Sequence, residues 1–222
     1  MESGRNLRSL NGSRGKIILR KSILVVITIF LAVVLLLFLR VRGSISIKPE
    51  KDFQIPENVV CAFQKNPLWN QDKLGTSAYT MGSSGCLTTC LTSVVDMQNI
   101  EIDQMRDGVT PGTLNALFSS HNVYDGDGNI QWGQLESLLG VSIVREQASA
   151  LSTGEIDHLL EQGCYPIVRV RVAGLGNYHF VLIVGAQDGE YLCMDPLNEK
   201  EEVVPLSKFW NRIYAVRYVK GI

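Results

Sequence analysis

The sequence predicts an α+β domain that follows one N-terminal membrane helix. An uncharged, strongly apolar run lies near the N-terminus, from Ser22 to Leu39. Behind it, the first half of the chain carries apolar residues at helical spacing, and the second half carries runs rich in β-branched residues. Helices grouped ahead of a mostly antiparallel sheet are typical of the α+β class.

The apolar run is long enough to act as a membrane anchor. Ile23 to Leu39 would form a helix of about 25 Å, which just spans a bilayer core. Lys21 and Arg40 flank the run and could reach the two interfaces. The alternative is a cleaved signal peptide, which would have a shorter apolar region and a small-residue cleavage site after it. Because RVRGSISIK follows instead, we expect an uncleaved anchor in the lipid bilayer.

Charge asymmetry predicts the orientation of this anchor. Residues 1–22 contain six basic residues and one acidic residue, whereas the segment from Gly43 onward contains 13 basic and 21 acidic residues. By the positive-inside rule, the N-terminus stays in the cytoplasm and the rest is extracytoplasmic. The whole chain of 222 residues has a net charge of −1 and is 45% hydrophobic, which indicates a globular protein and argues against nucleic-acid binding or disorder. The oligomeric state is not predicted.

The chain therefore divides into four expected segments: a basic cytoplasmic tail (1–21), the anchor (22–39), a polar stalk with two prolines (40–60) and one globular domain (61–222). Five cysteines are an odd number for a compartment in which disulfides form. Pairing could absorb four of them and would leave one free, but the sequence does not fix the pattern.

The expected elements of the domain follow from periodicity and from capping residues. Proline and glycine mark several of the boundaries. We predict helices over 86–97, 112–120, 132–139 and 153–162, and strands over 141–144, 165–172, 179–186, 190–194, 201–204 and 213–219.

The stretch MGSSGCLTTCLTSV, from Met81 to Val94, places Cys86 at the start of a predicted helix. Unpaired N–H groups and the positive end of the helix dipole would face its sulfur and favour a thiolate. The small residues before it would let the backbone turn tightly and leave the sulfur accessible. The alternative for Cys86 is a buried thiol or a disulfide.

A nucleophilic thiolate needs a base, and His179 is the best candidate among three histidines. It follows the turn-forming GLGNY and opens the strand HFVLIVGA. His121 and His158 are expected on the surface. The alternative role of His179 is a hydrogen-bonded histidine without catalytic function.

Asp195, in the sequence MDPL, lies at the far end of the next predicted strand. A two-residue turn at Asp188-Gly189 would put it on the opposite face from His179. A loop one residue longer, beginning at Gln187, would put it opposite Val181, on the face of His179. We expect the longer loop, with the carboxylate orienting the imidazole. The alternative is a local role, since Asp-Pro often starts a turn.

Together these motifs resemble the papain-like cysteine peptidase superfamily, and most closely its bacteriocin-processing (double-glycine leader) branch. The matching motifs are QKNPLW, GSSGC, GNIQWGQLESLLG, EQGCYPIVRV, YHFVLIVGA and MDP, and they cover Ala62 to Tyr218. The resemblance implies a papain-like fold, with a helical half packed on the sheet and the catalytic cysteine at a helix N-terminus.

The resemblance also implies roles for individual residues. Cys86 would be the nucleophile, His179 the general base and acid, and Asp195 the orienting residue. Gln64 would help to stabilise the oxyanion, with Gln71 as a rival, and the backbone N–H of Cys86 would be the second donor. No cofactor or metal is implied.

The family usually has Gly-Pro-x-Ser after the cysteine, where this chain has Leu87-Thr88-Thr89-Cys90. Cys90 lies one helical turn after Cys86 and could bond to another cysteine or pack as a buried thiol. A bridge between Cys86 and Cys90 would be strained and is not expected. With no CxxC pair and one well-placed histidine, zinc is not expected.

The segment from Asp125 to Glu136 partly matches a calcium-binding loop. Oxygen-bearing side chains fall at loop positions 1, 3, 5 and 12, but Ile130 stands where glycine is required. A solvated glycine-rich turn is the preferred interpretation.

The sequence thus predicts a membrane-anchored, extracytoplasmic cysteine peptidase or amidase that cuts a peptide bond through a thioester. The expected partner is an exported peptide or a cell-wall peptide. The alternatives are an inactive papain-like module that binds such peptides and a scaffold protein of a membrane complex.

Overall fold

The computed structural model describes residues 4–105, 108–152 and 154–220, with side chains from Arg20 onward. The chain divides into two compact units, Met1–Arg42 and Gly43–Ile222.

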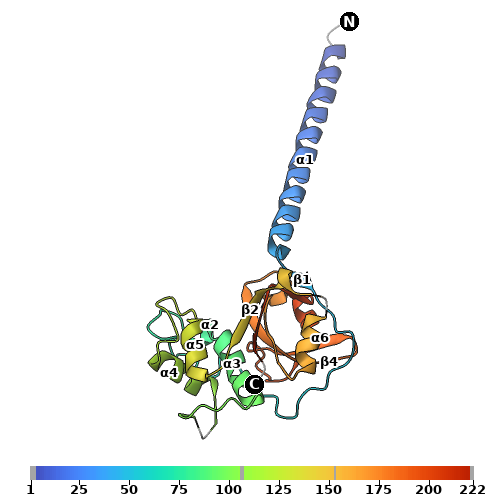
Figure 1. Ribbon diagram of the computed structural model, residues 1–222. Coiled ribbons are helices and arrows are strands. Elements are labelled where there is room, and N and C mark those ends of the chain that lie inside the picture. Colours follow the sequence, from blue (N-terminus) through green and yellow to red (C-terminus); the bar gives the residue numbers. More distant parts are fainter. Residues whose placement is uncertain (1–3, 106–107, 153, 221–222) are drawn as a thin grey trace. The chain divides into compact units, whose positions relative to one another are not determined.

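The first unit is one long helix, α1 (Gly4–Val41; Figure 1). Its segment Arg20–Val41, 22 residues, is long and apolar enough to cross a membrane, and its side chains are not buried against other parts of the protein. The basic segment predicted as a tail is helical from Gly4 and continuous with the apolar part. The helix continues through this basic segment because the segment lacks proline and is rich in leucine, arginine and lysine, which favour helix.

The second unit contains the remaining helices, and its first half is helical as predicted. These helices are α2 (Met81–Ser84), α3 (Cys86–Met97), α4 (Pro111–Ser120), α5 (Trp132–Leu139) and α6 (Glu155–Glu161). Thr110 caps α4 ahead of Pro111, and Gly140 ends α5 in the left-handed conformation. The short helix α2 was not expected.

A six-stranded antiparallel sheet, in the order β2-β8-β3-β4-β5-β6, forms the other half of the described domain. A separate pair joins β1 to β7. The strand bounds are β1 (Ile45–Ser46), β2 (Ile143–Gln147), β3 (Ile167–Arg171), β4 (Tyr178–Gln187), β5 (Glu190–Met194), β6 (Val204–Pro205), β7 (Arg212–Ile213) and β8 (Ala215–Val219). The predicted α+β class is confirmed.

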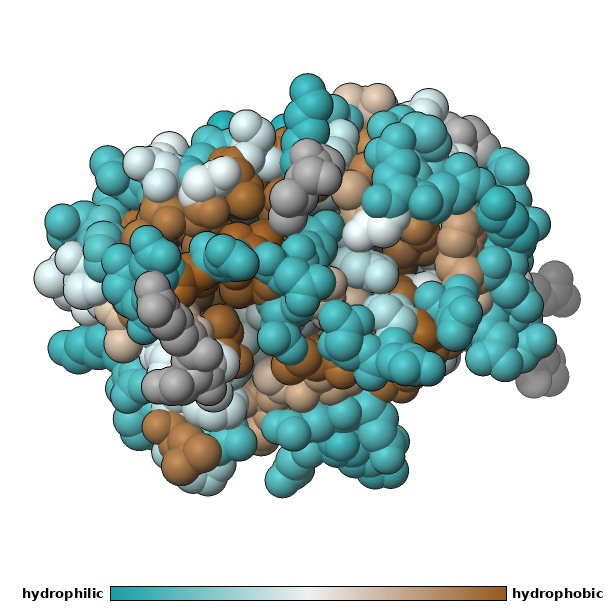
Figure 2. Space-filling model, turned by 60° about the horizontal axis from the view of Figure 1, so that its bottom comes forward, coloured by the Kyte–Doolittle hydropathy of each residue, from teal (hydrophilic) through white to brown (hydrophobic). Residues whose placement is uncertain are grey.

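The sheet is covered on both faces. Residues alternate along β4, so that Leu182 and Val184 join a core with α3, α4 and α5, while Val181 and Ile183 join a second core with α6. Figure 1 shows α2 to α5 gathered on one side of the strands and α6 on the other. On the face drawn in Figure 2, hydrophilic residues surround separate hydrophobic patches, as is usual for a domain in contact with water.

The segment predicted as a stalk packs on the domain instead. Ile45 pairs with Ile213, and Phe53 forms a bridge with Ala186. The N–H of Glu50 donates to the buried Asp157 carboxylate at 2.8 Å. Residues 45–53 therefore follow the sheet rather than forming a free linker, because they satisfy backbone groups that the strands leave open.

The turn between β4 and β5 also differs from the prediction. It has two residues, Asp188 and Gly189, both with positive φ, so that Gln187 pairs with Glu190. A β-bulge at Val184 then shifts the register by one, and Leu182 faces Met194. Continued by one residue, this register puts position 195 opposite position 181, as the longer loop would have done.

The loop from Asp125 to Asn129 is a turn closed by its own hydrogen bonds. Oδ1 of Asp125 accepts from the N–H groups of Asp127 and Asn129 at 2.9 and 2.8 Å, and the side-chain amide of Asn129 donates to both carboxylate oxygens. These bonds make Asp125 the residue that closes the turn.

Candidate active site

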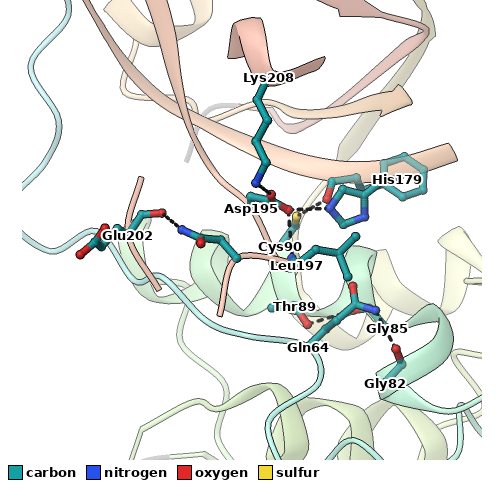
Figure 3. A network of polar contacts seen from close by, with 12 residues as sticks. Gln64, Gly82, Gly85, Thr89, Cys90, His179, Asp195, Leu197, Glu202 and Lys208 are labelled. Atoms are coloured by element: carbon teal, nitrogen blue, oxygen red, sulfur yellow. Dashed lines mark hydrogen bonds and ion pairs between the residues drawn. The ribbon is translucent and has the colours of Figure 1, made fainter. Parts of the chain in front are cut away.

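Cys86 begins α3 directly after a sharp connection from α2. Gly85 lies at the junction, where a Cβ atom would come 2.5 Å from the carbonyl oxygen of Met81. Only glycine fits this close approach. The carbonyl of Gly85 accepts from the N–H and the hydroxyl of Thr89 at 2.9 and 3.0 Å, which fixes the first turn of α3 (Figure 3).

Cys90 fixes the position of α3 against the sheet. It is fully buried, and its Sγ lies 3.6 Å from the carbonyl oxygen of Phe180 in β4. Burial raises the pKa of the Cys90 thiol well above its ordinary value, so this residue stays a packed, neutral thiol. The five cysteines, all within the described residues, form no disulfide, so the pairing considered from the sequence is not observed.

Cys86 and His179 lie close enough to interact, although more than ninety positions separate them, since the Cys86 thiol is one of the groups that raise the pKa of His179. His179 is 3% exposed and stands near the start of β4, one residue before Phe180. Its Nε2 lies 2.8 Å from Oδ1 of Asp195. Because that bond occupies Nε2, the other ring nitrogen, Nδ1, is the one available to the sulfur.

The carboxylate of Asp195 is held by three donors. Oδ1 accepts from His179 and from the N–H of Leu197 at 2.9 Å, while Oδ2 accepts from Nζ of Lys208 at 2.8 Å (Figure 3). Asp195 is buried, whereas the Lys208 side chain is 45% exposed. The carboxylate therefore cannot rotate without breaking charge-assisted bonds.

Lys208 is a site residue that sequence reasoning missed. It lies in the short 3₁₀ helix Leu206–Phe209, after β6. Nothing in LSKFW marks this lysine as functional. Its position depends on how β6 and the following turn pack beside β5, which the sequence pattern does not reveal.

The environment shifts the pKa values of both partners of the ion pair, Asp195 and His179. Burial raises the pKa of Asp195, but hydrogen bonds from His179 and Lys208 outweigh it and hold that pKa at about 2. Burial lowers the pKa of His179, but its hydrogen bond to Asp195 and its interaction with Cys86 raise that pKa to about 9. The arrangement thus favours a charged imidazolium against an ionised carboxylate at neutral pH.

Gln64 lies between the cysteine and aspartate segments. Its side-chain Nε2 donates to the carbonyl of Gly82 at 3.1 Å, and its backbone N–H donates to Pro196 at 2.9 Å. The residue is 3% exposed, and its Oε1 has no partner among the described residues. One hydrogen of Nε2 remains for another acceptor. The rival, Gln71, is exposed.

The remaining histidines lie apart from these contacts. His121 and His158 are both exposed, as expected. His158 is near Glu161 on α6, and His121 follows α4.

Cys86 opens into a pocket of about 520 Å³. Ser84 and Tyr79 line it from the α2 side, and Tyr178 and Phe180 line it from β4. Tyr79 and Tyr178 are about half exposed and form an aromatic rim. The space is large enough for several residues of an extended peptide.

No family model matches the chain, and no curated protein matches it. Among solved structures, the fold resembles a protein from Bacillus anthracis that is provisionally described as a C39-like peptidase. The two chains share 18% identity with a TM-score of 0.47, and the match covers 77% of this chain and 98% of the other. This limited likeness concerns the fold, and the site is defined by its own contacts.

Proposed function

We propose that this protein is a papain-like cysteine peptidase or amidase, anchored in a membrane by α1 and active outside the cytoplasm. One observation carries the proposal. The buried His179–Asp195 hydrogen bond lies beside Cys86, which lines a pocket large enough for a peptide. Such a nucleophile, base and orienting group are the parts that acyl transfer requires.

In the first step, the Cys86 sulfur attacks a substrate carbonyl carbon as a thiolate, while the proton it has given up is held on Nδ1 of the charged His179 ring. The resulting oxyanion accepts hydrogen bonds from the Cys86 N–H, in the first turn of α3, and from the free N–H of Gln64. The C–N bond then breaks, and the imidazolium donates its proton to the leaving amine. A thioester on Cys86 remains.

In the second step, His179 removes a proton from water, and the hydroxide oxygen attacks the thioester carbonyl. The C–S bond breaks, the carboxylic acid product leaves, and the sulfur regains the proton from His179. Asp195 holds the ring in the tautomer that presents Nδ1 to the sulfur, and Lys208 holds Asp195. No cofactor takes part in this scheme.

The likeness to bacteriocin-processing peptidases suggests exported peptides as substrates, and cell-wall cross-links are a second class. The charge asymmetry around α1 supports an extracytoplasmic location for the domain.

A cysteine-directed peptidyl epoxide tests the proposal on the full chain in detergent micelles. An active enzyme is labelled on Cys86, and labelling is lost in Cys86→Ala and strongly slowed in His179→Ala. Cys61→Ala is the matched control, since Cys61 is the other partly exposed free cysteine. Labelling that is equal in Cys86→Ala and wild type would refute the proposal.

An inactive binding module is a second candidate, favoured by the departure at Leu87-Thr88-Thr89-Cys90. It predicts that Cys86 reacts no faster than Cys61, while peptides still bind the pocket. The same labelling experiment distinguishes the two functions.

A further inference from the structure

Three arginines lie together on one face of the sheet. Arg145 on β2 pairs directly with Arg217 on β8, and Arg169 lies on the next strand, β3, diagonal to Arg217. Like charges directly opposite each other destabilise a sheet. The fold alone therefore gives no reason to gather these residues.

The guanidinium groups lack anionic partners within the described parts of the chain. No carboxylate oxygen there lies within 4.0 Å of the three arginines. Nε of Arg169 and both Nε and Nη1 of Arg217 are buried without a hydrogen-bond partner. Burying such donors costs free energy unless an acceptor reaches them.

Aromatic rings hold these cations in place. Arg217 stacks over Phe180 at 4.7 Å and over Trp132 at 5.4 Å, and Arg169 lies 4.5 Å from the centre of the Tyr178 ring. Ring faces attract the positive charge, but they leave the in-plane N–H groups for oxygen acceptors. Burial, together with Arg169 and Arg145, lowers the pKa of Arg217 to about 10, so it stays charged at neutral pH.

Arg169 and Arg217 line the same pocket as Cys86. One carboxylate, Asp127, also lines the described pocket, but it is exposed and forms no ion pair with either arginine. The pocket therefore joins a nucleophile to two cations that have no counter-ion among the residues whose side chains are described.

We infer that Arg169 and Arg217 bind a carboxylate of the substrate while Cys86 attacks a nearby peptide bond, so that peptides carrying a carboxylate near the cleaved bond are the preferred substrates. The planar N–H groups of arginine match a carboxylate in a bidentate arrangement. This inference rests on the proposed function for the cleavage step only. The carboxylate comes from an acidic side chain or from a chain terminus, and both supply the same group.

Binding to the full-length Cys86→Ala protein in detergent micelles tests the inference without catalysis. Three peptides are compared by calorimetry: blocked tetraglutamate, tetra-alanine with a free carboxyl terminus, and blocked tetraglutamine. We expect one of the two carboxylate peptides to bind at least tenfold more tightly than tetraglutamine. The winning peptide identifies the source of the carboxylate. Equal affinity for all three overturns the inference.

Added Arg169→Gln and Arg217→Gln substitutions assign the effect to the two arginines. Each is expected to remove most of the carboxylate preference, while Arg212→Gln, which loses the same charge on β7 outside the pocket, keeps it. Since Arg217→Gln relieves the repulsion between like charges, the melting temperature of this variant should equal or exceed that of the parent protein. A preference that survives both pocket substitutions overturns the inference, as does an equal loss in Arg212→Gln.

The two proposals fail separately. Carboxylate-selective binding by a protein whose Cys86 is unreactive supports the arginine site and refutes the peptidase. Reactive Cys86 with no carboxylate preference supports the peptidase and refutes the arginine site.

Discussion

Lys208 binds the one oxygen of Asp195 that His179 does not. Its Nζ lies 2.8 Å from Oδ2, and the imidazole Nε2 lies 2.8 Å from Oδ1. A partly exposed lysine therefore fixes the carboxylate of the buried His179–Asp195 pair from its other side. Without Lys208, Asp195 would lose a neighbouring positive charge, and its carboxylate could rotate more easily.

Lys208→Met should lower kcat/KM about twofold to fivefold, because partly exposed ion pairs contribute roughly 0.2–1 kcal/mol. Lys208→Arg should retain most of the activity, and Lys200→Met, on an exposed residue, should have no effect. The acid limb of the pH–rate profile should move to higher pH in Lys208→Met, since the pKa of Asp195 rises without the lysine. An unchanged profile in Lys208→Met would show that the contact is structural only.

Asp195 acts by orientation in this account, so its replacements should differ. Asp195→Asn keeps an oxygen that can accept from Nε2, although its amide nitrogen would face Nζ of Lys208, and it should lose less kcat than Asp195→Ala. Asp195→Ala removes the acceptor and leaves Lys208 without its partner, and it should lose about a hundredfold or more. Steady-state kinetics on purified protein measure both. Equal losses would point to charge rather than orientation.

The pH dependence follows from the shifted pKa of His179. Its folded value, about 9, lies above the ordinary 6.5, so proton binding to His179 stabilises the folded protein fully below about pH 6.5. That contribution is lost as pH rises through about 9. Thermal unfolding from pH 6 to 10 should show this loss in wild type and a flatter profile in His179→Gln.

Activity should fall over the same basic range, because the leaving amine needs the imidazolium proton. The measured limb belongs to the coupled Cys86–His179 pair. Activity that keeps rising beyond pH 10 would contradict a role for the protonated ring.

Gly85→Ala should damage both folding and activity. The added Cβ would lie 2.5 Å from the Met81 carbonyl oxygen and 2.8 Å from the Met81 sulfur. We expect a loss of about 1–3 kcal/mol in the free energy of unfolding and slower labelling of Cys86, since α3 must shift. Gly133→Ala, where a Cβ meets nothing within 4 Å, is the matched control. Equal stability of the two variants would show that the junction is not tight.

Much of the domain follows local rules that a sequence displays. The start of α3 at Cys86 and the strand that carries His179 were predicted from helical spacing, small residues and β-branched runs. Those signals are local, since each lies within about a dozen residues. We expected Cys86 and His179 to lie close together. The contact between Cys90 in α3 and Phe180 in β4 brings the two elements that carry them together.

The features that the sequence did not predict depend on distant contacts. The bulge at Val184 lies beside Gly185. Phe53, from the segment predicted as a stalk, packs closely there, and a Cβ atom on Gly185 would come 2.8 Å from the carbonyl oxygen of Phe53. Lys208 meets Asp195 only through the fold of β6 and the following turn. In each case the partner is set by tertiary packing, and no local motif encodes it.

The most direct test of the Cys86–His179 pair is to trap the acyl-enzyme. The full-length protein is mixed with a peptide 4-nitrophenyl ester, quenched in acid within milliseconds and digested for mass spectrometry. We predict that the acyl group is found on the peptide containing Cys86, at a rate that falls about a hundredfold or more in His179→Ala. Turnover with no adduct on Cys86, or the same rate of acylation in His179→Ala, would contradict the account.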